Sequence, residues 1–255
     1  MSQDYKFSTI EVEIDEHILT ATMNRPDQLN AVNGALHEDL EHLFARVAED
    51  DEVDVVILTG AGRAFCAGGD VKGMADGSMI PAGGRHAPLT WFTGGPQRLI
   101  RNMLSVPQPM IAAVNGHAVG LGATLALFCD VVLVADNAKI GDTHTKVGLV
   151  AGDGGAVIWP LLVGVNRAKE LLMTSELLSA AEAERLGLVN HVYPAAEVMP
   201  EAKALAERLA GMPLAAVRYT KQAVNKLLWE RMVSTLDTSL AFEAISSTAG
   251  PIGRR

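Results

Sequence analysis

The sequence has little cysteine and no excess of positive charge, and both shortages exclude classes of protein. Two cysteines in 255 residues, Cys66 and Cys129, are too few for a disulfide framework, and both lie in apolar segments. Thiols that stay reduced are typical of a cytoplasmic protein. The formal net charge of -9 provides no excess of lysine and arginine for a nucleic-acid partner or an anionic membrane.

Long apolar runs and several well-known site motifs are also missing. No run approaches the ~20 apolar residues of a membrane-spanning helix, and residues 1–16 carry charges where a signal peptide needs an apolar core. There is no phosphate-binding Gly-Lys-Ser/Thr loop, no zinc-type Cys/His spacing and no Gly-x-Ser-x-Gly nucleophile motif. The segment 59–70 begins like a dinucleotide-binding fingerprint, but Phe65 stands where the third glycine is needed. We therefore expect no metal and no bound cofactor.

The apolar pattern of the chain, which is 49% hydrophobic, predicts an α/β fold. Alternation over 8–15 and 17–24 predicts an antiparallel strand pair, and Asn33 is placed to cap a following helix. From about Trp159 onward the chain should be helical except for one strand near 188–194. Three continuous apolar runs predict buried strands of a mainly parallel sheet: 53–60, 110–116 and 130–136. A long loop is expected over 60–89 and a helix over 90–104.

Two glycine-rich turns each follow a predicted strand, at Ala67-Gly68-Gly69-Asp70 and Gly120-Leu121-Gly122. Both can present bare backbone N–H groups to an oxygen that gains negative charge. The second turn also lies at the start of an apolar helix, whose dipole favours a negative ligand. Alternatively, the glycines serve only for tight turns and close packing of helix on strand.

A set of motifs connects these turns to a known family. They are Met-Asn-Arg-Pro at 23–26, Ala-Phe-Cys-Ala-Gly-Gly-Asp at 64–70, P-x-I-A-A-V-N-G-x-A-x-G at 109–120, Leu-Phe-Cys-Asp at 127–130 and AERLGLVNHVYP at 183–194. With them, the chain from Ile10 to Ser247 resembles the crotonase, or enoyl-CoA hydratase/isomerase, superfamily. The resemblance implies a crotonase-type spiral of ββα turns over residues 1–195. It also implies a helical C-terminal oligomerisation region over 196–255 and a homotrimer or hexamer.

The resemblance further implies an acyl-CoA thioester as substrate, with coenzyme A part of that substrate. Its carbonyl oxygen would lie between the backbone N–H groups of Gly69 and Leu121. Arg25 and Lys72 are either partners of the CoA phosphates or solvated surface charges, and 73–89 would form a mobile gate over the acyl pocket. The implied substrate- and CoA-binding residues are Arg25, Asn30, Ala31, Arg63, Ala64, Ala67, Gly68, Asp70, Lys72 and Gly120.

The chain departs from the family at the two acid/base positions, where a typical hydratase has glutamates. Thr124 and His144 occupy these positions. Asp153, within a glycine turn, is our candidate base, or else it caps the next helix. His144 is either a proton relay or a packed loop residue, and Thr124 either holds a water or bonds its own helix backbone.

These residues leave several activities open. The leading prediction is hydration/dehydration or double-bond isomerisation of an acyl-CoA thioester through an oxyanion-stabilised enolate. Hydrolysis of a C–C bond in a β-diketone or β-ketoacyl substrate is one alternative. A non-catalytic CoA-thioester-binding or assembly protein is the other.

Overall fold

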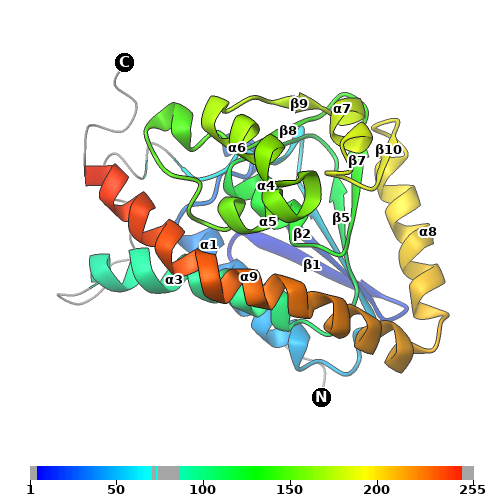
Figure 1. Ribbon diagram of the computed structural model, residues 1–255. Coiled ribbons are helices and arrows are strands. Elements are labelled where there is room, and N and C mark those ends of the chain that lie inside the picture. The colour runs from blue at the N-terminus through cyan, green and yellow to red at the C-terminus, as the bar shows by residue number, and fades with distance from the viewer. Residues whose placement is uncertain (1–4, 71–72, 74–86, 249–255) are drawn as a thin grey trace.

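The computed structural model describes the backbone of residues 5–70, 73 and 87–248. It describes the side chains of the same residues except 87–93. Two sheets and a set of covering helices form the fold (Figure 1). The first sheet has six strands in the order β1-β2-β3-β5-β7-β10. Its strands are β1 (Ile10–Asp15), β2 (Ile18–Met23), β3 (Val55–Gly60), β5 (Met110–Val114), β7 (Val131–Ala135) and β10 (His191–Tyr193).

The pairing within this sheet agrees with the sequence pattern. β1 and β2 pair antiparallel, and every later pair is parallel. In β2 every second residue is buried, as expected of a strand with one covered face. In β3 and β5 all residues are buried, because parallel strands between helices are covered on both faces.

A second, four-stranded sheet has the order β4-β6-β8-β9 and was not predicted. Its strands are β4 (Ala64–Cys66), β6 (His117–Val119), β8 (Lys139–Gly141) and β9 (Leu178–Ser179). The expectation of an uninterrupted loop from residue 60 was therefore wrong, and so was that of a single strand beyond Trp159. Strands of two or three residues are too short to show a period of two.

The two sheets together produce the spiral that the resemblance implied. The chain passes from β3 to β4, from β5 to β6 and from β7 to β8, so each pass adds one strand to each sheet. The fold class is thereby confirmed as a crotonase-type α/β spiral with a helical C-terminal part, and the division at residue 195 stays a prediction.

The α-helices are α1 (Gly34–Ala48), α3 (Ala87–Ser105), α4 (Leu121–Leu127), α5 (Gly155–Val163), α6 (Val165–Thr174), α7 (Ala180–Arg185), α8 (Val198–Ala210) and α9 (Leu214–Thr248). Two 3₁₀ turns, η1 (Pro26–Gln28) and η2 (Thr145–Val147), complete the order.

The last helix, α9, is a single helix of 35 residues that runs along α3 and α5 (Figure 1). Two basic side chains fix its first half to the sheet. Lys221 Nζ lies 2.7 Å from Asp130 Oδ2 and donates to the carbonyl of Gln108 at 2.8 Å. Arg218 Nη2 donates to the carbonyl of Val53 at 2.9 Å. Among the residues that the structure describes, neither α9 nor any other helix is both long and apolar enough to cross a bilayer.

A fully buried asparagine ties the segment after β2 to the segment after β3. Asn30 Nδ2 donates to the carbonyls of Ala61, Ala64 and Phe65 at 3.0, 2.9 and 3.2 Å. Its Oδ1 accepts the N–H of Arg25 at 2.9 Å. The geometry of this corner therefore depends on an amide that both donates and accepts.

Replacing Asn30 by aspartate should lower the free energy of unfolding by about 3 kcal/mol, because a carboxylate cannot donate to the three carbonyls. The left-handed backbone at this position, with φ of 56°, suits both residues, so the change isolates the lost donor. Chemical denaturation measures the effect. The same substitution at exposed Asn166 should stay within about 0.5 kcal/mol, and equal losses at the two positions would contradict the assignment.

Candidate active site

The two glycine turns lie against each other at the ends of β4 and β6. Gly69 forms a parallel bridge with Val32, in which Val32 N–H donates to Gly68 O at 2.8 Å and Asp70 N–H donates to Val32 O at 3.0 Å. Because successive groups of extended backbone point in opposite directions, the N–H of Gly69 faces away from Val32. Leu121 begins α4, so its N–H has no carbonyl within the helix.

The backbone of both turns requires glycine. Gly68 and Gly120 have φ of +91° and +54°, and a Cβ on Gly68 would lie 2.7 Å from the carbonyl oxygen of Val119. With hydrogen alone at these positions, the turns approach closely enough to border one small pocket. Its lining residues are Ala67, Gly68, Gly69, Gly120, Thr143, His144, Val147 and Leu149.

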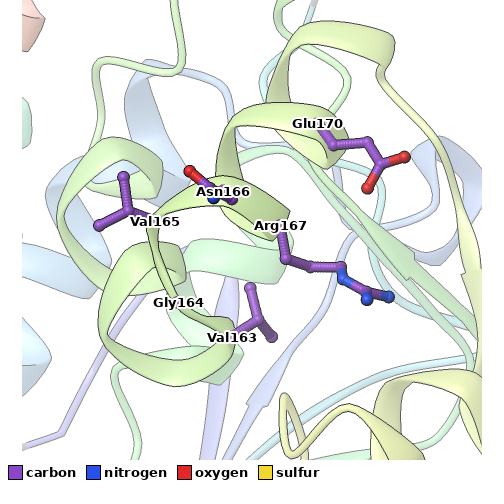
Figure 2. A pocket seen from close by; sticks show the side chains of 6 residues that line it. All are labelled: Val163, Gly164, Val165, Asn166, Arg167 and Glu170. Atoms are coloured by element: carbon purple, nitrogen blue, oxygen red, sulfur yellow. The ribbon is translucent and has the colours of Figure 1, made fainter.

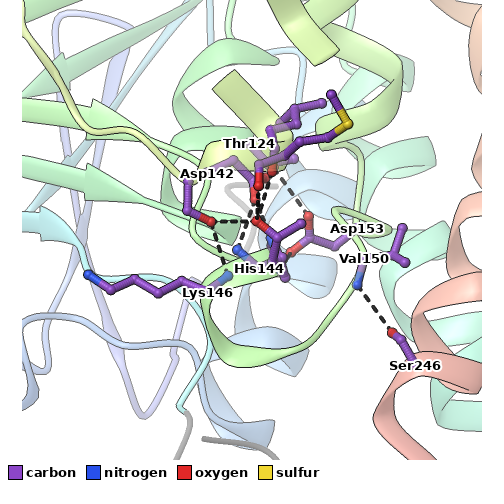
Figure 3. A network of polar contacts seen from close by, with 11 residues as sticks. Thr124, Asp142, His144, Lys146, Val150, Asp153 and Ser246 are labelled. Atoms are coloured by element: carbon purple, nitrogen blue, oxygen red, sulfur yellow. Dashed lines mark hydrogen bonds and ion pairs between the residues drawn. The ribbon is translucent and has the colours of Figure 1, made fainter. Parts of the chain in front are cut away.

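Beside this pocket, a buried histidine lies between two buried aspartates (Figure 3). His144 Nδ1 lies 2.8 Å from Asp142 Oδ1, and His144 Nε2 lies 3.1 Å from Asp153 Oδ2. The backbone N–H of His144 also donates to Asp142 Oδ1 at 3.0 Å. Each ring nitrogen therefore faces its own carboxylate, and the choice between a proton relay and a packed loop residue for His144 stays a prediction.

The two carboxylates decide the charge of His144. Burial by itself would lower the pKa of the imidazole, but the charges of Asp153 and Asp142 and their hydrogen bonds outweigh burial and hold it well above 6.5. His144 is therefore an imidazolium at neutral pH. An imidazolium has no free lone pair with which to accept a proton.

Asp153 contacts both Thr124 and His144, the residues predicted to stand at the acid/base positions. Thr124 Oγ1, on α4, donates to Asp153 Oδ1 at 3.3 Å, while His144 faces Oδ2 of the same carboxylate. The capping alternative for Asp153 is wrong, because the N-cap of α5 is Gly154 and no side-chain cap bond is formed there. The backbone alternative for Thr124 is likewise replaced by its contact with Asp153.

The same three side chains are of types that can bind a metal ion. Asp142, His144 and Asp153 can bring one ligand atom each within 4.8 Å of one another. In the structure, however, both ring nitrogens of His144 already face carboxylates, and a ring nitrogen that carries a proton cannot bind a metal. In this arrangement the three side chains form a chain of ion pairs.

The implied CoA-binding residues lie along the edge formed by 25–31 and 63–70. Arg25 is engaged there, since its Nη1 donates to the carbonyl of Ala31 and its Nη2 lies 3.8 Å from Asp70 Oδ2. Arg25 is therefore not a freely solvated charge. Arg63 is exposed, whereas Ala64 is buried. Lys72 and 74–86, with most of the proposed gate, lie outside the described residues.

Sequence reasoning did not single out the part of α9 that contacts the Asp153 turn. Ser239, Glu243 and Ser246 lie on one face of α9 and all reach residues 150–152. No motif marks these residues, and nothing in the local pattern distinguishes them from the other polar residues of the helix. Only the path of α9 across the core brings them to the site.

A second hollow is open to solvent and lies where α5 meets α6 (Figure 2). None of the predicted site residues lines it. Its lining residues are Val163, Gly164, Val165, Asn166, Arg167 and Glu170.

The chain was compared with known proteins. The profile of the family described as Enoyl-CoA hydratase/isomerase matches residues 13–247. Among curated relatives, the probable enoyl-CoA hydratase echA8 of Mycobacterium bovis is 36% identical over 93% of this chain and 87% of its own length. The 1,2-epoxyphenylacetyl-CoA isomerase of Escherichia coli is 35% identical over 90% of this chain and 85% of its own. A solved enoyl-CoA hydratase/isomerase from Mycobacterium paratuberculosis superposes with a TM-score of 0.87 at 38% identity, covering 94% of this chain and 93% of the other.

We expect His144 to stay doubly protonated well above pH 6.5, because its pKa is raised by two carboxylates. The pKa is higher in the fold than in the unfolded chain, so this charge stabilises the fold fully below about pH 6.5 and ceases to do so as the pH rises through the folded pKa. A titration of labelled imidazole nitrogens by NMR measures the shift. Asp153→Asn should lower the pKa of His144, whereas the control Asp136→Asn, at an exposed position, should leave it unchanged. An ordinary pKa for His144 in the unmodified protein would refute the ion pairs.

Proposed function

The chain belongs to the enoyl-CoA hydratase/isomerase family, and we propose that it shifts a carbon–carbon double bond in an acyl-CoA thioester. Membership makes it an enzyme that acts on acyl-CoA thioesters. Relatives in the family are named both as hydratases and as isomerases, so the family alone leaves the reaction open.

In this proposal the thioester oxygen binds between the N–H groups of Gly69 and Leu121. Both groups are free of the backbone pairing around them; Gly69 lines the pocket between the glycine turns, and Leu121 directly follows Gly120, which also lines it. When a proton leaves the carbon beside the thioester, negative charge develops on this oxygen. Fixed donors and the α4 dipole stabilise that charge, and one such donor contributes about 3 kcal/mol.

Asp153 is the proposed base, and one observation carries the choice of reaction. Hydration would need Asp153 and His144 to share the activation of water and the protonation of the substrate, but both ring nitrogens of His144 are engaged by buried carboxylates. A double-bond shift needs only one base. Thr124 and His144 then hold the two oxygens of Asp153 in place, and Asp142 holds His144.

Hydration remains the second candidate, because several relatives are named enoyl-CoA hydratases, including the short-chain-enoyl-CoA hydratase of Clostridium acetobutylicum, 34% identical over 94% of this chain.

CoA itself is proposed to lie along the edge formed by 25–31 and 63–70. The edge holds Ala31, Arg63 and Ala67 at or near the surface. Arg25 would assist by fixing Ala31 and Asp70 rather than by offering a free charge.

A homotrimer or a pair of trimers is proposed for the assembly. Its support is the large apolar surface that α5, α6 and α9 leave uncovered in one chain. The exposed residues on or next to α5 and α6 are Leu161, Leu162, Val165, Met173 and Leu177, and those on α9 include Tyr219, Leu227 and Val233. A cytoplasmic location is proposed as well, since Cys66 and Cys129 are buried free thiols.

The proposed reaction is tested with matched 3-enoyl-CoA and 2-enoyl-CoA thioesters of short, medium and aromatic chains. We expect 3-enoyl thioesters to become 2-enoyl thioesters with no change in mass, read by chromatography and mass spectrometry. A gain of one water would establish the hydratase instead. Cleavage of a β-ketoacyl substrate alone, or tight binding without turnover, would refute both.

Asp153→Asn should lower kcat for this conversion by about 10³-fold, because the amide cannot accept the proton. Binding of the thioester, followed by calorimetry, should change little since the oxyanion donors are backbone groups. Asp136→Asn, the same change at an exposed position, is the control. A variant at position 153 that keeps most of its activity would remove Asp153 as the base.

The assembly is tested by sedimentation. The native protein should sediment as a multiple of three chains. A paired Val165→Glu and Met173→Glu variant should sediment as a smaller species with unchanged circular dichroism, because each charge would have to be buried at the contact. A native protein that sediments as a single chain would refute the proposal.

A further inference from the structure

Helix α9 brings a third carboxyl group to the Asp153 turn. Ser239 Oγ donates to the carbonyl of Gly152 at 2.9 Å. The N–H of Val150 donates to Ser246 Oγ at 3.2 Å (Figure 3). Glu243 lies between these two serines on the same helical face. The helix therefore holds the turn on both sides of Glu243, directly before Asp153.

Gly152 is what allows this approach. A Cβ at residue 152 would overlap Oε2 of Glu243 and would lie 2.7 Å from the Cβ of Glu243. Any side chain at 152 would push the acid away from the turn. Glu243 itself is half-buried, so packing restrains its side chain without enclosing it completely.

The surroundings of Glu243 favour its protonated form. Burial raises its pKa to about 8, the charge of Asp153 adds to the rise, and that of Asp142 adds further, while His144 opposes it. Within the described residues, these three groups, from the turn before α5 and the segment after β8, are the charges that act on it. A carboxylic acid that keeps its proton near neutral pH can donate it in catalysis, and this one lies against the turn that carries Asp153.

We propose that Glu243 is the proton donor of the reaction, paired with Asp153 as the proton acceptor. The proposal rests on the proposed isomerase function and adds to it a second group, supplied by the C-terminal helix. The substrates are then 3-enoyl thioesters: Asp153 takes the proton from C2, and Glu243 gives a proton to C4.

The step balances with these two groups alone. The C2–H bond breaks, its proton passes to Asp153, and the electron pair moves into the dienolate, whose oxygen lies at the glycine turns. A C4–H bond then forms with the proton of Glu243, and the double bond moves to C2–C3. Asp153 is left protonated and Glu243 ionised, and a proton transfer between the two carboxyl groups restores the starting state.

Glu243→Gln tests the donor, because the amide keeps the size of the acid and removes its acidic proton. In D₂O, the variant should still incorporate deuterium at C2 of a 3-enoyl-CoA thioester through Asp153, while conversion to the 2-enoyl product falls at least about 100-fold with little change in KM. Glu243→Asp should recover part of the conversion. Glu230→Gln, the same substitution at an exposed position of the same helix, is the control.

The pH profile separates this role from a structural one. In the native enzyme, conversion should fall as the pH rises through about 8, where Glu243 loses its proton. Exchange at C2 should not follow this fall. If exchange and conversion decline together in Glu243→Gln, the side chain only supports the turn and the proposal is overturned. If the Glu243→Gln variant converts the substrate as fast as the Glu230→Gln control does, the proposal is overturned as well.

Thermal unfolding decides the protonation state without any substrate. The folded pKa of Glu243 is raised, so the native protein should lose stability as the pH rises from about 4.5 to 8, whereas Glu243→Gln should not. The gap in Tm in favour of the variant should therefore widen toward alkaline pH. A gap of the opposite sign means that Glu243 is a stabilising anion and overturns the proposal. If no 3-enoyl thioester is converted by the native enzyme, the isomerase function fails, and the melting curves still report on Glu243.

Discussion

A buried imidazolium between two aspartates is the interaction on which the site depends. Asp142, His144 and Asp153 are all at least nine-tenths buried, and the two distances from the imidazole are 2.8 and 3.1 Å. Removing one partner from a buried ion pair costs about 3–5 kcal/mol, because the charge left behind has neither water nor a counter-ion. The three residues therefore act as a unit, in which His144 fixes the orientation of both carboxylates.

This unit is assembled from segments that the two-sheet spiral brings together. The loop after β8 supplies Asp142 and His144, α4 supplies Thr124, and the turn before α5 supplies Asp153. The proposed backbone donors come from the ends of β4 and β6, which are neighbours in the second sheet. In the proposed site the spiral thus separates two tasks, since the donors are main-chain groups near the strand ends while the acid/base groups are side chains of later segments.

Much of this arrangement could be predicted from the sequence, and the parts that could not have identifiable reasons. The antiparallel pair, the buried parallel strands and the Asn33 cap follow from local periodicity and capping preferences, and Asn33 does accept the N–H of Leu36. The short strands β4, β6 and β8 gave no periodic signal. Asp153 and His144 could be named as candidates, but not that the two would form an ion pair, because that depends on how loops distant in sequence pack. Glu243 lies on a helix whose pattern looks like that of any amphipathic helix, and its contact with the Asp153 turn arises only from the path of α9.

The close contact between Gly152 and Glu243 also has an evolutionary consequence. A Cβ at residue 152 would lie 2.7 Å from the Cβ of Glu243 and 2.7 Å from the carbonyl oxygen of Ser239, so any side chain there would displace α9 itself as well as the acid. Replacement of Gly152 during evolution therefore requires a shift of the whole helix, whereas the acid at 243 can be lost without any change at 152.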